Sequence, residues 1–107
     1  MTNHQFYTLW GEAITSPDRD AFVSDAALSS LWGKDDADPM AHVPELEKLW
    51  DAAHTGVKAI REFAGMTQAE FAARHLVPLR TLQRWEKGEC PEHIRLFLLE
   101  SEGMYKR

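Results

Sequence analysis

One stretch of the chain, residues 66–88, constrains the fold more than any other. Pro78 near its middle has a preset φ that suits the start of a helix, and Gly88 is the residue type that commonly ends one. Leu82 and Trp85 are three residues apart, so they face the core together. The stretch therefore predicts two short helices joined by a tight turn.

The first half of the chain also predicts helices and no strand. Apolar residues follow helical spacing over residues 4–14. Ser16-Pro17-Asp18 predicts a second helix, with Ser16 as its N-cap, that ends near Gly33. Pro44 lies in the first turn of a third helix that runs to Ala53. We therefore expect an all-α fold, a small helical bundle.

Capping signals divide the second half into four helices. Thr55-Gly56 predicts a break, with Thr55 as the N-cap of a helix over Val57–Ala64. Thr67 caps the next helix, and Glu70 three residues later completes a capping box. Pro91 opens the last one. The residues expected to face the core are Val57, Ile60, Phe63, Ala64, Phe71, Ala72, Leu76, Leu82, Trp85, Ile94, Phe97 and Leu98.

Length and composition define the class of protein. A chain of 107 residues, 44% of them apolar, supports one compact domain or a small domain with an attached bundle. The single cysteine, Cys90, cannot form an internal disulfide, and no apolar N-terminal stretch resembles a signal peptide or membrane span. We expect a cytoplasmic protein without membrane attachment.

Charge is distributed unevenly, although the net charge is −5. Residues 1–54 hold three basic and ten acidic residues, whereas residues 55–107 hold nine basic and seven acidic residues. Binding to phosphates depends on the local field, so the overall negative charge does not exclude nucleic acid. We expect two parts: an acidic helical region at 1–54 and a second domain at 55–107.

Other kinds of site lack the residues they need. Cys90 and His93 form a lone Cys-x-x-His, too few ligands for zinc. The acidic run Asp35-Asp36-x-Asp38 lacks the glycine and terminal glutamate of a calcium loop, and we interpret it as solvated. No Gly-rich phosphate loop and no nucleophile–base arrangement is found. The sequence predicts no catalytic residue, metal or cofactor, and hence not an enzyme.

Residues 57–99 resemble the helix-turn-helix of the Cro/XRE repressor family. The features that match are Thr67-Gln68-x-x-Phe71-Ala72, the apolar Val77, Thr81-Leu82, and Trp85-Glu86-x-Gly88. The resemblance covers about 40% of the chain, and polar, small and apolar positions all agree. It implies a DNA-binding domain at 55–107 with an N-terminal helical extension.

The resemblance also implies a role for each residue of the site. Gln68 would bind a backbone phosphate and brace the recognition helix, and Lys87 would add a phosphate contact. Thr81 would touch phosphate or pack locally. Arginine suits guanine and leucine suits the thymine methyl group. The positions that would meet base edges are occupied by Leu79, Arg80, Gln83 and Arg84.

Two further expectations follow from the resemblance. The family often carries a structural ion pair between its first and third helices, and the matching residues are Arg61 and Glu86. The family usually has glycine in the turn between helices two and three, whereas this chain has Leu76. This predicts either a slightly reshaped turn or a left-handed leucine, which would cost about 1–2 kcal/mol.

The expected function is that of a sequence-specific transcriptional regulator. Such proteins bind double-stranded DNA as two-fold dimers on palindromic operators, so we expect a homodimeric repressor of a small operon, acting on its own promoter. The alternative is an antitoxin-like protein that binds a partner protein through its N-terminal half. We expect the N-terminal helices to supply dimer contact through some of Trp10, Trp32 and Trp50, or else to pack only on their own bundle.

Overall fold

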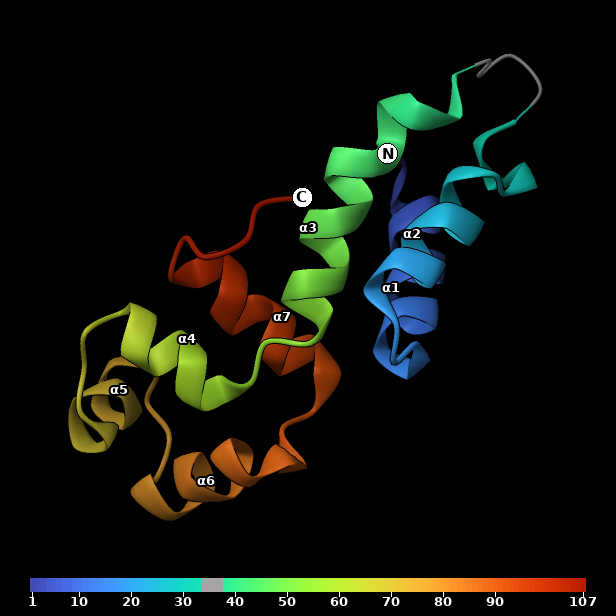
Figure 1. Ribbon diagram of the computed structural model, residues 1–107. Coiled ribbons are helices and arrows are strands. Elements are labelled where there is room, and N and C mark those ends of the chain that lie inside the picture. The colour runs from blue at the N-terminus through green and yellow to red at the C-terminus, as the bar shows by residue number, and fades with distance from the viewer. Residues whose placement is uncertain (34–37) are drawn as a thin grey trace. The chain divides into compact units, whose positions relative to one another are not determined.

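The structure is a computed structural model that describes residues 1–33 and 38–107. Within these ranges the regular elements are all helical, as predicted, and their chain order can be followed in Figure 1. The residues form two compact units, which we call the N-terminal unit (Met1–His54) and the C-terminal unit (Thr55–Arg107). Three residues of the acidic run, at positions 35–37, lie outside the described ranges. None of the described helices has the length and apolar character of a membrane span.

Three α-helices form the N-terminal unit, and α3 packs against both of the others. Two short 3₁₀ helices lie between the second and third α-helices. Pro44 lies in the first turn of α3, as predicted. The α-helices are α1 (Asn3–Thr15), α2 (Arg19–Ala27) and α3 (Val43–Ala53), and the 3₁₀ helices are η1 (Ser30–Trp32) and η2 (Pro39–His42).

The start and end predicted for α2 were wrong. Its N-cap is Asp18, whose carboxylate accepts from the backbone N–H of Ala21 at 3.1 Å, whereas Ser16 ends the preceding helix. A carboxylate accepts the free N–H groups of a first turn at least as well as a hydroxyl does, so Asp18 takes this place. The α-helix ends at Ala27, and it is η1 that ends at Gly33.

The three tryptophans of the N-terminal unit contact residues of the same unit. Trp10 is buried. The indole N–H of Trp32 donates to the Ala26 carbonyl at 2.8 Å, and that of Trp50 donates to the Ser16 carbonyl at 3.2 Å. Trp32 and Trp50 are half-buried, and their N–H groups are satisfied within the unit. All three tryptophans therefore pack on their own bundle, and a contribution to a dimer contact stays a prediction.

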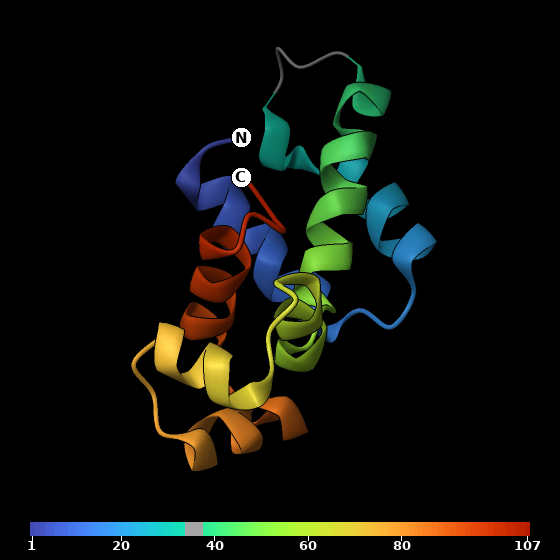
Figure 2. The ribbon, with the colours of Figure 1, turned by 90° about the vertical axis from the view of Figure 1, so that its left-hand side faces the viewer.

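Four α-helices form the C-terminal unit, and the third is extended by one wider π-helical turn. Figure 2 shows this unit from a second direction. The α-helices α4 and α7 pack against each other, as do α5 and α6. The elements are α4 (Val57–Phe63), α5 (Gln68–Arg74), α6 (Leu79–Arg84), η3 (Trp85–Glu89) and α7 (Glu92–Ser101).

Local capping explains where these helices begin. The Thr67 hydroxyl accepts from the Glu70 N–H at 3.2 Å and the Glu70 carboxylate accepts from the Thr67 N–H at 3.0 Å, which is the predicted capping box. The break before α4 is also present, but its N-cap is Gly56 and not Thr55. Pro78 precedes α6 in an extended conformation (ψ 144°), so it is the N-cap rather than the first helical residue.

The core of the C-terminal unit differs from the predicted one on α4 and α7. Phe63 is 57% exposed and Phe97 is 59% exposed, so both were wrongly placed inside. Ile94 and Ala64 are only half-buried. In a short helix, the spacing of apolar residues is compatible with either of two adjacent faces being buried. Here packing against the other helices buries the face next to the predicted one. The buried residues are Val57, Ile60, Phe71, Ala72, Leu82, Arg95, Leu96, Leu98 and Leu99.

The turn between α5 and α6 places Leu76 in the left-handed region, with φ 56°. Its side chain is 92% exposed, so the prediction that it faces the core was wrong. The backbone nevertheless follows the path that normally requires glycine, since the Val77 N–H donates to the Ala72 carbonyl at 2.9 Å and closes the turn. The exposed leucine side chain therefore gains no packing energy that would offset the cost of the left-handed backbone conformation.

Glu102 joins the end of α5 to the end of α7. Its carboxylate oxygen Oε1 accepts from Arg74 Nε at 2.8 Å and from His75 Nε2 at 2.7 Å, and its side chain is only 6% exposed. Burial opposes ionisation, but the two hydrogen bonds outweigh it and lower the pKa of Glu102. The ionised carboxylate is therefore part of the folded structure.

Replacing Leu76 by glycine should stabilise the C-terminal unit. Glycine adopts the left-handed conformation without a Cβ clash, so Leu76→Gly should raise the free energy of unfolding by about 1 kcal/mol relative to Leu76→Ala, which keeps the clash. Urea unfolding of both variants measures the difference. Equal stability would mean that the turn carries no strain.

Replacing Glu102 should destabilise the protein in a pH-dependent way. Glu102→Gln should lower the free energy of unfolding by about 1–3 kcal/mol at neutral pH. Because the folded pKa is lowered, the stabilisation by Glu102 is complete above the unfolded pKa and is lost as the pH falls through the folded pKa. Urea unfolding should therefore give different free energies of unfolding for wild type and variant at neutral pH, and the two values should converge as the pH is lowered. A gap that does not change with pH would contradict this account.

Candidate nucleic-acid interface

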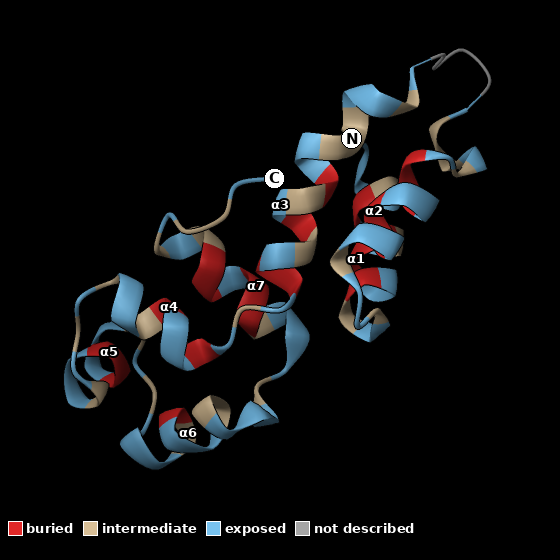
Figure 3. Ribbon diagram, in the orientation of Figure 1, coloured by how far each residue is buried: buried red, intermediate tan, exposed pale blue. Residues whose placement is uncertain are grey.

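The outer side of α6 and its extension carries polar and basic side chains, which we call the basic face. Figure 3 shows most of α6 as exposed. On a helix of 3.6 residues per turn, positions 80, 83, 84 and 87 lie within about 100° of one another around the axis, and Leu82 lies on the opposite side. The members of the basic face are Arg80, Gln83, Arg84 and Lys87, all exposed.

The inner side of α6 fixes the helix to its own unit. Leu82 is completely buried, and Trp85 at the next position on that side is half-buried. Burying a leucine side chain contributes about 1.5–3 kcal/mol. Leu79, at the start of the helix, keeps 44% of its surface exposed, and Thr81 is half-buried. Leu79 therefore lies at the edge of the basic face, and Thr81 lies partly turned toward the protein.

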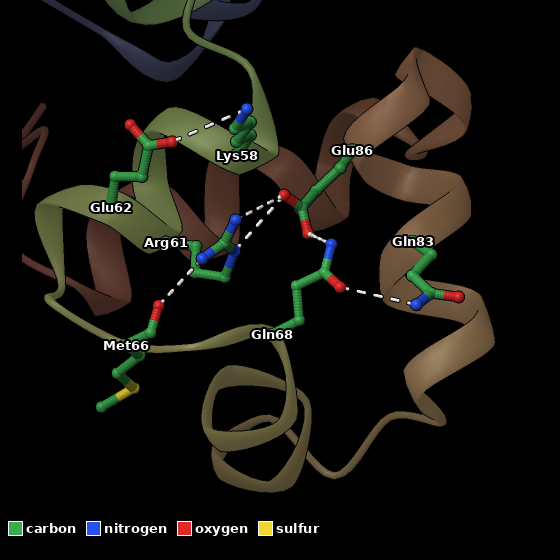
Figure 4. Close-up of polar contacts among 7 residues, drawn as sticks. All are labelled: Lys58, Arg61, Glu62, Met66, Gln68, Gln83 and Glu86. Atoms are coloured by element: carbon green, nitrogen blue, oxygen red, sulfur yellow. Dashed lines mark hydrogen bonds and ion pairs between the residues drawn. The ribbon is translucent and has the colours of Figure 1, made fainter.

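An ion pair between Arg61 and Glu86 joins α4 to η3, the segment that continues α6, as predicted (Figure 4). Arg61 Nη2 lies 3.0 Å from Glu86 Oε1, and Arg61 Nε donates to the same oxygen at 3.3 Å. Arg61 Nη1 donates to the Met66 carbonyl at 3.0 Å. The two side chains are 14% and 7% exposed, so water screens this pair far less than a surface pair.

Gln68 extends this cluster toward the basic face. Its amide nitrogen donates to the second carboxylate oxygen of Glu86 at 3.0 Å (Figure 4). An ionised carboxylate accepts only, so the amide nitrogen of Gln68 points to Glu86 and its oxygen points away. That oxygen lies 3.5 Å from Gln83 Nε2, a long hydrogen bond. The cluster therefore sets the direction in which both amides face.

The charged members of the basic face differ in their contacts. Arg84 Nε donates to Glu89 Oε2 at 3.1 Å. Arg80 and Lys87 make no hydrogen bond or ion pair with any residue in the described ranges. Glu86 is buried against Arg61, so the outward charge of this region comes from three basic side chains and Glu89. Its local charge is positive, although the chain as a whole is negative.

Two charged residues that contribute to this unit were not predicted. Arg95 is buried on α7, where Nη1 donates to the Thr55 carbonyl at 2.8 Å and Nε donates to Glu92. It joins α7 to Thr55, two residues before α4. The sequence signal for this role was the position of Arg95 within an apolar stripe, three residues after Glu92, with which it could pair on the same helix. Glu102, which pairs with Arg74, is the second of these residues.

The sequence features considered for a metal form no site within residues 1–33 and 38–107. No group of three or more His, Cys, Asp or Glu side chains that could hold an ion is found there. Burial raises the pKa of the Cys90 thiol to about 11, so it is protonated at neutral pH. A protonated thiol is neither a good metal ligand nor a nucleophile.

The chain matches no family model, no curated protein and no solved structure.

Removing Arg61 should strongly destabilise the C-terminal unit. Arg61→Met leaves the carboxylate of Glu86 buried without its cation, and breaking a buried pair in this way costs about 3 kcal/mol or more. Lys58→Met is the matched control, because Lys58 lies on the same helix but pairs with Glu62 at 4.0 Å on an exposed surface. The control should cost less than about 1 kcal/mol. Denaturant unfolding gives both values, and equal losses would contradict a structural role for the pair.

Proposed function

We propose that the protein is a sequence-specific regulator of transcription that binds double-stranded DNA through α6. In this proposal α5 and α6 are a helix-turn-helix of the Cro/XRE type, and the basic face lies in the major groove. Two copies of the chain bind the two halves of a palindromic operator and repress a small operon, including the gene of the protein itself.

The observation that carries the proposal is the contrast between the two sides of α6. One side is held by the buried Leu82, and the other offers Arg80, Gln83 and Arg84 to solvent. Arginine pairs bidentately with guanine and glutamine with adenine, and both need a rigid support to discriminate between bases. The buried Arg61–Glu86 pair beneath this helix supplies part of such a support.

The direction of the amides adds to this support. Gln83 Nε2 lies 3.5 Å from the Gln68 oxygen, and the oxygen and second N–H of the Gln83 amide have no partner among the described residues. An acceptor and a donor side by side match N6 and N7 of adenine. Gln68 keeps a second N–H that could reach a phosphate. The polar groups of the face thus have the arrangement needed for both base and backbone contacts.

Selection of bound duplexes from a random pool tests the proposal. Wild type should enrich a two-fold-symmetric motif, because two copies read two half-sites. Arg80→Ala and Arg84→Ala should each relax the preference at particular base pairs, by about 1–3 kcal/mol per position. Lys48→Ala is the control, since it removes one exposed positive charge from α3 in the N-terminal unit. It should select the wild-type motif.

Three results would count against the proposal in different ways. Enrichment of no sequence by wild type would overturn it. An asymmetric motif would exclude the two-fold dimer but keep the DNA-binding surface. Weaker binding of the arginine variants at every sequence, without a positional change, would make Arg80 and Arg84 phosphate contacts.

A further inference from the structure

The turn after α6 brings Glu89 back to the side of the helix that carries Arg84. Residues five apart on a regular α-helix lie about 140° from each other, on different sides. Here the chain leaves the helical path at Gly88, which takes φ 99°, in the region that favours glycine. As a result the Glu89 carboxylate lies 3.1 Å from Arg84 Nε.

This contact occupies only one edge of the Arg84 guanidinium group. Glu89 accepts from Nε, and the terminal nitrogens Nη1 and Nη2 have no partner among the described residues. Arg84 is 68% exposed, so these two nitrogens face solvent. Bidentate recognition of guanine requires two adjacent N–H donors aimed at O6 and N7. The carboxylate therefore leaves free the end of the side chain that such a contact needs.

We propose that Glu89 is a positioning residue that orients Arg84 for guanine and thereby sets base specificity. The inference rests on the proposed function, because it assigns Arg84 a base contact. An arginine has four rotatable side-chain bonds, and ordering them at binding costs affinity. The ion pair with Glu89 is already formed in the free protein, so it removes part of the entropic cost of ordering Arg84 in the conformation that the pair holds.

Glu89 also has an opposite effect on binding, and this makes the inference testable. Its side chain is 60% exposed, so its negative charge acts on the phosphates of any duplex and weakens binding at every sequence. Orientation of Arg84, in contrast, affects only the base pair that Arg84 meets. Glu89 should therefore lower total affinity while raising discrimination at one position of each half-site.

Three variants separate these two effects. Glu89→Ala removes both the charge and the acceptor, whereas Glu89→Gln removes the charge but keeps an oxygen that can accept from Arg84 Nε. Glu62→Ala is the matched control, because Glu62 is equally exposed (60%) and lies on α4 of the same unit. Binding is measured on the selected duplex and on duplexes with the guanine replaced, at several salt concentrations. Circular dichroism confirms that each variant is folded.

The two variants at Glu89 should diverge in specificity. Glu89→Ala should lower the preference for guanine at the Arg84 position by about three- to fivefold, the upper part of the range for an exposed ion pair. Glu89→Gln should keep that preference within about twofold, and both should bind all duplexes more tightly than wild type does. Glu62→Ala should leave the preference at that position unchanged.

Two outcomes would overturn the inference and can be told apart from a failure of the proposed function. If Arg84→Ala relaxes the preference at one base pair and Glu89→Ala does not, Glu89 is only a charge, and DNA recognition by α6 stands. If Arg84→Ala changes no positional preference, Arg84 reads no base, and the inference fails together with that part of the proposed function.

Discussion

The carboxylate of Glu86 is the point on which the C-terminal unit depends. It accepts from Arg61 on α4 and from Gln68 on α5, and it lies itself at the end of α6. Helices of six or seven residues are too short to be stable in isolation. Each of these three gains its stability from packing and from this shared charge. The same carboxylate also orients the Gln68 amide, because it accepts from the amide nitrogen and so leaves the amide oxygen on the side that faces away.

Helix boundaries could be predicted from the sequence where capping chemistry is local. The capping box at Thr67 and the proline before α6 depend on neighbours in the chain, and both signals located their helices. The buried faces of α4 and α7 could not be predicted equally well. Phe63 and Phe97 fit the spacing of a buried stripe, but a helix of 7 to 10 residues allows two stripes, and the partner helices decide between them.

More of the candidate site was predicted from the resemblance to the Cro/XRE family than from the spacing of residues along the helices. The pairing of Arg61 with Glu86, 25 positions apart, could not follow from any local pattern. The same limit explains why Arg95 and Glu89 were missed. Arg95 lies inside an apolar stripe, and its contact with Thr55 spans 40 positions. The contact of Glu89 with Arg84 depends on the kink at Gly88, which a glycine allows but does not by itself predict.

Leu76 before α6 and Gly88 after it both have positive φ, and in the proposed complex they would limit how much of a duplex one copy of this helix can span. The six residues of α6 rise about 9 Å along the helix axis. Base pairs are stacked about 3.4 Å apart, so this length corresponds to fewer than three base-pair steps. A lengthened α6 would require both ends to be redesigned, because each turn reverses the chain within a few residues. The footprint of this surface is therefore set by backbone conformation before any side chain is chosen.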